Sequence, residues 1–234
     1  LLAVLTLCAC GDKAQDGSNG EDAAVAWDAL SFDKTMPLDY ATQFSVSFAG
    51  DDYKRITIGQ DQEFLLVTEG AAVPEGVTVL RQPLDEIYLV ASAAMDSFAQ
   101  LDAVDSIRFS GRKESDWYIE QAKEAMSAGD MLYAGKYSEP DYELILSQGC
   151  DLVLENTMIY HSPEVIEQFE TLGIPVLVEM SSYESRLAAW SGSSSTVRSS
   201  ARRTRPRRCL RRKWTAFQAF WALRPRERPS HSSM

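Results

Sequence analysis

Short apolar segments alternate with segments of helical periodicity between residues 86 and 180, and this alternation constrains the fold more than any other feature of the sequence. The apolar segments have the length and composition of buried parallel strands; they cover residues 86–92, 105–109, 131–134, 150–155 and 174–179. The helical segments between them cover residues 93–101, 116–127, 141–147 and 162–172. Strands that alternate with helices build a parallel sheet through right-handed crossovers. The sequence therefore predicts an α/β fold with a Rossmann-like parallel sheet.

Helix boundaries within this region carry recognisable signals. Ser162, Pro163 and Glu164 stand together at the start of the last helical segment. Serine is a common N-cap residue, proline suits the first turn, and a carboxylate favours the positive helix end. Gly129 and Gly173 follow two of the helical segments, and glycine often ends a helix. We expect a serine-capped helix after residue 162 and helix ends at both glycines.

Residues 53–67 predict a β-hairpin upstream of the alternating region. Two strand-like runs flank Gly59, Gln60, Asp61 and Gln62, which supply turn chemistry. A second turn is predicted at residues 73–76 because proline and glycine stand close together there. The pattern before Asp51 assigns no element.

The predicted sheet also selects the loops in which a site can form. Ligand sites on parallel sheets lie beyond the carboxyl ends of the strands; the corresponding loops are residues 92–95, 135–137, 156–161 and 181–184. No GxGxxG follows a strand and no GxxxxGK[ST] occurs, so a phosphate-cradling loop is unsupported. No Ser/His/Asp set has a recognisable spacing either. The sequence therefore favours a binding protein over an enzyme.

The alternative is an enzyme on an α/β domain with His161 and Glu164 at its active site. Their HxxE spacing allows a pair of metal ligands on an α/β domain. A histidine directly before a helix start is more often structural, and an isolated pair is a weak metal signal. We therefore expect neither a metal nor a cofactor in this protein.

Aromatic and methionine side chains gather at the predicted strand ends, namely Tyr137, Tyr142, Met158, Tyr160 and Tyr183. Each one alone is best explained by ordinary core or rim packing. Together, around one edge of a sheet, they suit a bulky and partly apolar ligand.

The amino-terminal residues LLAVLTLCAC resemble the end of a signal peptide followed by the lipobox of bacterial lipoproteins. The resemblance implies lipidation of Cys10, with residues 1–10 as the signal remnant. Residues 11–32 then form a flexible polar tether. The alternative is a buried strand with two ordinary cysteines. Cys150 and Cys209 form no CxxC pair, so neither a metal site nor a disulfide framework is indicated.

Three short motifs between residues 134 and 185 resemble one family of transport proteins. They are PDYE at residues 140–143, DLV at residues 151–153 and GIPV at residues 173–176. In this order they resemble the amino-terminal lobe of bacterial solute-binding proteins of the iron-siderophore, haem and cobalamin class, which serve ABC importers. The resemblance covers roughly residues 80–184. Cys150 departs from it, because the family usually has proline there.

The resemblance implies two α/β lobes joined by a long helix, of which residues 33–185 would be the first and the second would be missing. It implies that the protein captures an iron chelate, haem or cobalamin-like ligand outside the cytoplasm and delivers it to a permease, without catalysis. Glu143 matches the family glutamate that docks onto permease arginines. Ligand contacts are expected at Tyr137, Asn156, Met158 and Tyr183. A solvated acid at a helix start is the alternative for Glu143.

The charge of the chain changes sign near residue 185. The first 184 residues hold 10 basic and 33 acidic residues, whereas the rest holds 13 basic residues and one acid. The acidic part repels phosphate backbones, so it does not bind nucleic acid through bulk charge. The basic part, residues 186–234, includes the run RRTRPRRCLRRK.

Two explanations of this basic segment stay open. One set of permitted codons for residues 186–198 encodes PGRMEWIKFYGA in another frame, close to the PLGRxEWIKFYG that follows in the family. Residues 186–234 are then a disordered frameshift product. Alternatively, the segment is a genuine tail that contacts nucleic acid or anionic lipid; aromatic residues at 214, 217, 220 and 221 would then support its charge.

We predict that resequencing of the gene from codon 170 to well past the stop will find a missing or extra base near codon 186. The repaired frame should encode PxGRxEWIKFYG followed by a second lobe. Independent amplicons control for amplification errors. An intact frame with no second lobe downstream would contradict the frameshift explanation and favour the genuine basic tail.

Overall fold

The computed structural model describes residues 26–37 and 42–180, and these residues form two five-stranded sheets. The carboxyl-terminal sheet has the order β12-β11-β6-β7-β8, and all four strand pairs are parallel. Its strands are β6 (Ile87–Leu89), β7 (Ile107–Ser110), β8 (Leu132–Tyr133), β11 (Leu152–Asn156) and β12 (Val176–Glu179). The predicted alternation and the α/β class with a parallel sheet are therefore confirmed.

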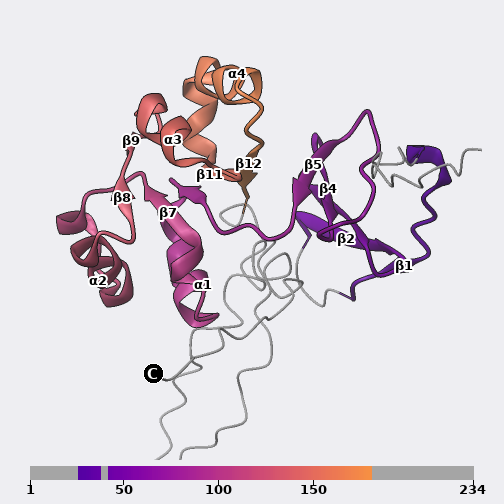
Figure 1. Cartoon of the computed structure of the whole chain (residues 1–234), viewed down its shortest axis with the longest axis horizontal. Coiled ribbons are helices and arrows are strands. Elements are labelled where there is room, and N and C mark those ends of the chain that lie inside the picture. The colour runs from indigo at the N-terminus through magenta and orange to yellow at the C-terminus, as the bar shows by residue number, and fades with distance from the viewer. Residues whose placement is uncertain (1–25, 38–41, 181–234) are drawn as a thin grey trace, which may run out of the picture.

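Helices cover both faces of the parallel sheet. Figure 1 shows α1 and α2 on one face and α3 and α4 on the other; their bounds are α1 (Met95–Gln100), α2 (Glu120–Ala128), α3 (Tyr142–Gln148) and α4 (Pro163–Thr171). Apolar side chains of the strands pack on both faces of the sheet, because successive side chains of a strand point to opposite faces. Ile87 and Leu89 of β6 pack on the α1/α2 face, whereas Tyr88 packs on the α3/α4 face.

Short 3-10 helices and a small hairpin complete the connections. The 3-10 helices are η1 (Trp27–Ala29), η2 (Ser92–Ala94), η3 (Val104–Ser106), η4 (Glu114–Asp116) and η5 (Thr157–His161). The hairpin consists of β9 (Gly135–Lys136) and β10 (Glu139–Pro140). It lies between β8 and α3, so it belongs to the carboxyl side of the sheet.

The predicted helix ends are mostly confirmed. Gly129 is the C-cap of α2 with φ 84°, and Gly173 follows α4 with φ 76°. Both torsions lie in the left-handed region that glycine adopts without strain. Pro163 occupies the first turn of α4, as expected. Ser162 is the N-cap residue, but the predicted side-chain cap is wrong: its torsions, φ −138° and ψ 60°, lie outside the usual extended N-cap region, and its hydroxyl makes no cap hydrogen bond.

The amino-terminal sheet has the order β1-β2-β3-β4-β5. Its strands are β1 (Lys34–Thr35), β2 (Phe44–Ala49), β3 (Tyr53–Ile58), β4 (Gln62–Val67) and β5 (Thr78–Arg81). The antiparallel pairing of β3 with β4 confirms the predicted hairpin, and Gly59 supplies its positive φ of 61°. The strands β1, β2 and β5 were not predicted.

The two sheets share one hydrophobic core and a pair of hydrogen bonds. Apolar residues of β2 to β5 belong to the same buried cluster as those of the α1/α2 face. The Gln62 Nε2 donates to the Val178 carbonyl at 3.0 Å, and the Val178 N–H donates to Gln62 Oε1 at 2.7 Å. Val178 lies on β12, an edge strand, so one side-chain amide takes the place of a neighbouring strand there.

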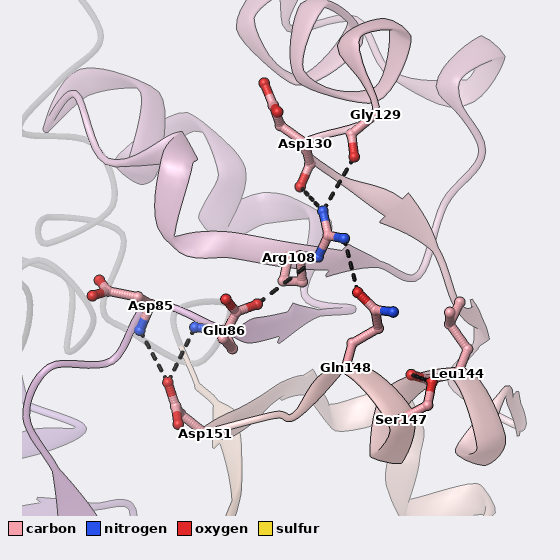
Figure 2. A network of polar contacts seen from close by, with 9 residues as sticks. All are labelled: Asp85, Glu86, Arg108, Gly129, Asp130, Leu144, Ser147, Gln148 and Asp151. Atoms are coloured by element: carbon pink, nitrogen blue, oxygen red, sulfur yellow. Dashed lines mark hydrogen bonds and ion pairs between the residues drawn. The ribbon is translucent and has the colours of Figure 1, made fainter.

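A polar network joins the amino ends of four parallel strands (Figure 2). Asp151, directly before β11, accepts hydrogen bonds at Oδ2 from the backbone N–H groups of Asp85 and Glu86, each at 3.1 Å. The Asp151 N–H in turn donates to the Glu86 carbonyl at 3.0 Å. These three bonds fix the start of β11 against the start of β6.

Arg108 of β7 extends the same network toward β8 and α3. Its guanidinium donates to the carbonyls of Gly129 and Asp130 at 3.1 and 2.8 Å and to Gln148 Oε1 at 3.0 Å (Figure 2). Glu86 Oε2 lies 3.9 Å from Arg108 Nε, too far for a hydrogen bond. Burial raises the pKa of Glu86, while Arg108 opposes that shift and Asp151 adds to it. The network lies at the opposite end of the sheet from the predicted site loops.

We predict that Asp151→Ala destabilises the fold by about 1–3 kcal/mol, because two backbone N–H groups lose their acceptor. Urea unfolding followed by circular dichroism measures the change. Glu124→Ala is the matched control, since it removes one exposed helical carboxylate for which the structure gives no hydrogen bond. Equal midpoints for the two variants would contradict a role of Asp151 in joining the strands.

Candidate functional site

The strand order creates a topological switch point between β6 and β11. From β6 the chain continues to β7 and β8 on one side, and it then returns to β11 and β12 on the other side. Ligands of open parallel sheets bind outside the carboxyl ends of the strands at such a point. The candidate site is therefore this carboxyl edge; it comprises residues 90–93 after β6, 110–113 after β7, 134–137 after β8 and 156–161 after β11.

The loop after β11 brings two of the predicted ligand contacts together. Asn156 ends β11, and its Oδ1 accepts a hydrogen bond from the Met158 N–H at 2.8 Å. This bond starts η5, which presents Met158 and Tyr160 to solvent with 49% and 53% of their surfaces exposed. Exposed thioether and phenol side chains beside a fixed amide form a surface that suits a ligand with large apolar parts.

Tyr137, a third predicted contact, lies in the turn of the β9–β10 hairpin. Its side chain is half-buried and packs against the core of the α3/α4 face. Gly135 fixes the hairpin, because a Cβ there would lie 2.2 Å from the Glu139 carbonyl oxygen. The Tyr88 hydroxyl donates to the Gly135 carbonyl at 3.1 Å. Tyr137 therefore sits on a rigid turn.

The structure does not bring all the predicted contacts to one point. Two strands lie between β8, which leads to Tyr137, and β11, which leads to Asn156 and Met158. At the usual strand spacing, β8 and β11 are roughly 14 Å apart. A ligand that contacts both sides must span β6 and β7. Tyr183 and Cys10 lie outside the described residues.

Glu143 lies in the first turn of α3, just after the β9–β10 hairpin, and its side chain is exposed. Asp141 caps this helix, since its Oδ1 accepts a hydrogen bond from the Leu144 N–H at 3.0 Å. Glu143 is therefore not needed for capping and is available to a partner. Leu146, one turn further on, is 47% exposed.

The structure gives no support to a catalytic centre at His161 and Glu164. Both side chains are exposed, and no group of three or more potential metal ligands occurs among residues 26–37 and 42–180. Cys150 is no better a candidate, because burial raises the pKa of its thiol to about 12 and keeps it protonated. Its Sγ donates to the Leu152 carbonyl at 3.5 Å.

Sequence reasoning missed Glu155, the residue before Asn156. It is fully buried, and neither carboxyl oxygen has a hydrogen-bond partner within the described part of the chain. Strand alternation points it to the α3/α4 face. Burial raises the pKa values of Tyr88 and Tyr142 there, and Glu155 adds to both shifts. Burial raises the pKa of Glu155 to about 8; the Asn156 N–H lowers it in part but falls short of hydrogen-bond geometry. Glu155 is therefore mostly neutral at pH 7.

Sequence reasoning also passed over the loop after β7. This loop contains Ser110, Gly111, Arg112 and Lys113 at the carboxyl end of a predicted strand. The rule that selected the other loops applies to it equally, so the signal was present in the sequence. The loop contributes two cations to an edge that is otherwise described by aromatic, thioether and amide groups.

Comparisons of the chain with protein-family models, curated proteins and solved structures found no match. Among the described residues, no helix combines the length and apolar character needed to cross a membrane.

We predict that Glu155 makes stability fall as the pH rises. Its folded-state pKa of about 8 lies above the usual glutamate value of 4.5, so the folded state binds its proton more tightly. That contribution is complete below pH 4.5 and is lost as the pH rises through about 8. The loss should amount to roughly 2–5 kcal/mol.

Urea unfolding from pH 5 to 9 measures this loss. Glu155→Gln, which cannot ionise, should show a much flatter profile than the unsubstituted protein. Glu167→Gln on the exposed side of α4 is the control and should keep the original slope. An unchanged slope in Glu155→Gln would assign the pH dependence to other groups.

Proposed function

We propose that this chain is the ligand-binding lobe of the extracytoplasmic solute-binding component of an ABC importer. The ligand class would be an iron chelate, haem or a cobalamin-like molecule. The observation that carries the proposal is the switch point between β6 and β11, beside which Asn156, Met158 and Tyr160 form an exposed, partly apolar surface. The PDYE, DLV and GIPV motifs support the same proposal.

The chemistry of the carboxyl edge supports binding rather than bond breaking. Its described residues include a thioether, phenols and an amide, which contact large ligands through dispersion and single hydrogen bonds. The amide of Asn156 keeps its Nδ2 donor for a ligand, because the bond to Met158 uses only Oδ1. A fixed polar group next to an apolar surface provides both orientation and contact area.

The face of α3 supports delivery of the ligand to a membrane partner. Glu143 and Leu146 are three residues apart, so they lie on the same side of the helix. Both are exposed. A carboxylate that accepts a bidentate bond from an arginine, next to an apolar contact, would form a small docking surface for a permease. Anchoring through Cys10 would hold the protein outside the cytoplasmic membrane.

A titration with iron(III) tris-catecholate, haem and cyanocobalamin tests the proposal by quenching of intrinsic fluorescence. We predict saturable binding of at least one of them to this chain. The affinity should be weaker than about 1 µM, or about −8 kcal/mol, because the resemblance implies that a second lobe completes the cleft. Micromolar or tighter binding would refute the need for a second lobe.

The double substitution Met158→Ala and Tyr160→Ala should weaken this binding by about fivefold or more, because it removes the exposed apolar contacts beside the switch point. Leu146→Ala is the matched control, since Leu146 is similarly exposed but lies on α3. An absence of saturable binding for all three compounds would overturn the proposed function.

A further inference from the structure

Two basic residues of the parallel-sheet region have no acidic partner. Between residues 86 and 180 the sequence holds five basic and 18 acidic residues. Three of the basic residues form ion pairs: Arg108 with Glu86, Lys123 with Glu120 and Lys136 with Glu139. The other two, Arg112 and Lys113, form no ion pair within the described part of the chain. Arg112 and Lys113 are therefore neighbouring cations whose charge no ion pair within the described residues neutralises.

These two cations lie in the loop after β7, directly beside the switch point. The Gly111 N–H donates to the Leu89 carbonyl of β6 at 2.8 Å. A Cβ on Gly111 would lie 3.1 Å from the Val90 Cα, so a side chain there would require the neighbouring backbone to shift by a few tenths of an ångström. The loop is therefore held against the carboxyl end of β6.

Ser110, the last residue of β7, fixes the conformation of the loop through its hydroxyl group. This residue is fully buried, and its hydroxyl donates to the Arg112 carbonyl at 2.8 Å. The same oxygen accepts from the Arg112 N–H at 3.0 Å and from Trp117 Nε1 at 3.1 Å. Two of these bonds hold the backbone of Arg112 in place, and the third holds the indole of Trp117.

Both cationic heads lie over aromatic rings. The Arg112 guanidinium carbon is 5.8 Å from the centroid of Trp117, and Lys113 Nζ is 5.7 Å from the centroid of Tyr133. Contact with a ring face positions a cation without using its N–H donors. Arg112 and Lys113 are both exposed, so these donors remain available to an anion.

The loop after β11, with Met158 and Tyr160, lies on the other side of β6. Since β7 and β11 both neighbour β6, they are roughly 10 Å apart. The residues that follow β6, between these two loops, include Ser92 and Ala93, which have small side chains. One ligand of moderate size could therefore touch the cations on one side and the apolar surface on the other.

We propose that Arg112 and Lys113 form an anion subsite, and that the ligand of this protein is an anionic chelate whose negatively charged oxygens are grouped at one end. This inference rests on the proposed function and narrows it. A ligand with no negative charge would gain nothing from the loop after β7, so the subsite separates charged iron chelates from neutral ones.

The test compares two iron(III) complexes of similar shape. The tris-catecholate complex is trianionic, and the tris-acetohydroxamate complex is neutral. We expect the unsubstituted chain to bind the trianionic complex about tenfold more tightly than the neutral one at low salt. The double substitution Arg112→Gln and Lys113→Gln should abolish this preference, because the trianionic complex loses far more affinity than the neutral one. The control double substitution, Lys34→Gln and Lys123→Gln, removes the same charge from two lysines outside the carboxyl edge, one exposed and one half-buried, and should keep the preference.

Other results of these titrations would overturn the anion subsite. Equal affinities of the unsubstituted chain for the two complexes would overturn the anion subsite but not the proposal that the protein binds a ligand. An equal loss of the preference in both double variants would do the same. If neither iron complex binds, the proposed function loses its iron-chelate ligands, and a citrate titration followed by NMR tests the subsite alone. Shifts of the amides of residues 111–113 that disappear in the Arg112→Gln and Lys113→Gln variant would support the subsite, and their absence in the unsubstituted chain would overturn it.

Discussion

The hydrogen bonds of Asp151 and Arg108 hold the amino ends of the parallel strands together, and the geometry of the opposite edge depends on them. The strands are short: β6 has three residues and β8 has two. So few residues form few ladder bonds, and the register therefore needs additional support. Side chains at the amino ends supply that support without occupying the carboxyl edge. The loops that carry Arg112 and Met158 consequently start from fixed positions.

Much of this fold could be predicted from the sequence, and the failures have physical causes. Buried parallel strands are apolar throughout, and glycines end the helices, so β6, β11, β12, Gly129 and Gly173 were found. The strand β5 was not found, because it pairs in parallel with β4 and its four residues alternate only weakly between buried and exposed. Which strand β5 pairs with depends on contacts between residues that are distant in the sequence. The predicted side-chain cap of Ser162 does not form, because the backbone torsions of Ser162 lie outside the usual N-cap region.

The candidate site was partly predictable. Asn156 and Met158 follow a strand that is easy to recognise, and the topology then places them at the switch point. Glu155 could not be found, because a glutamate at the end of an apolar strand normally faces solvent. Its burial depends on the packing of α3 and α4 against the sheet, which the local sequence does not encode. Arg112 and Lys113 could have been found by the rule used for the other loops.

The amide of Gln62 has a consequence for association between copies of the protein. A free edge strand offers unpaired backbone groups to any extended chain, and such edges promote aggregation. At Val178 the N–H and carbonyl that face outward from β12 are already bonded to a single side chain. An incoming strand would have to displace two hydrogen bonds at once and would form only the same two in return. The middle of this edge is therefore protected against sheet extension by one residue.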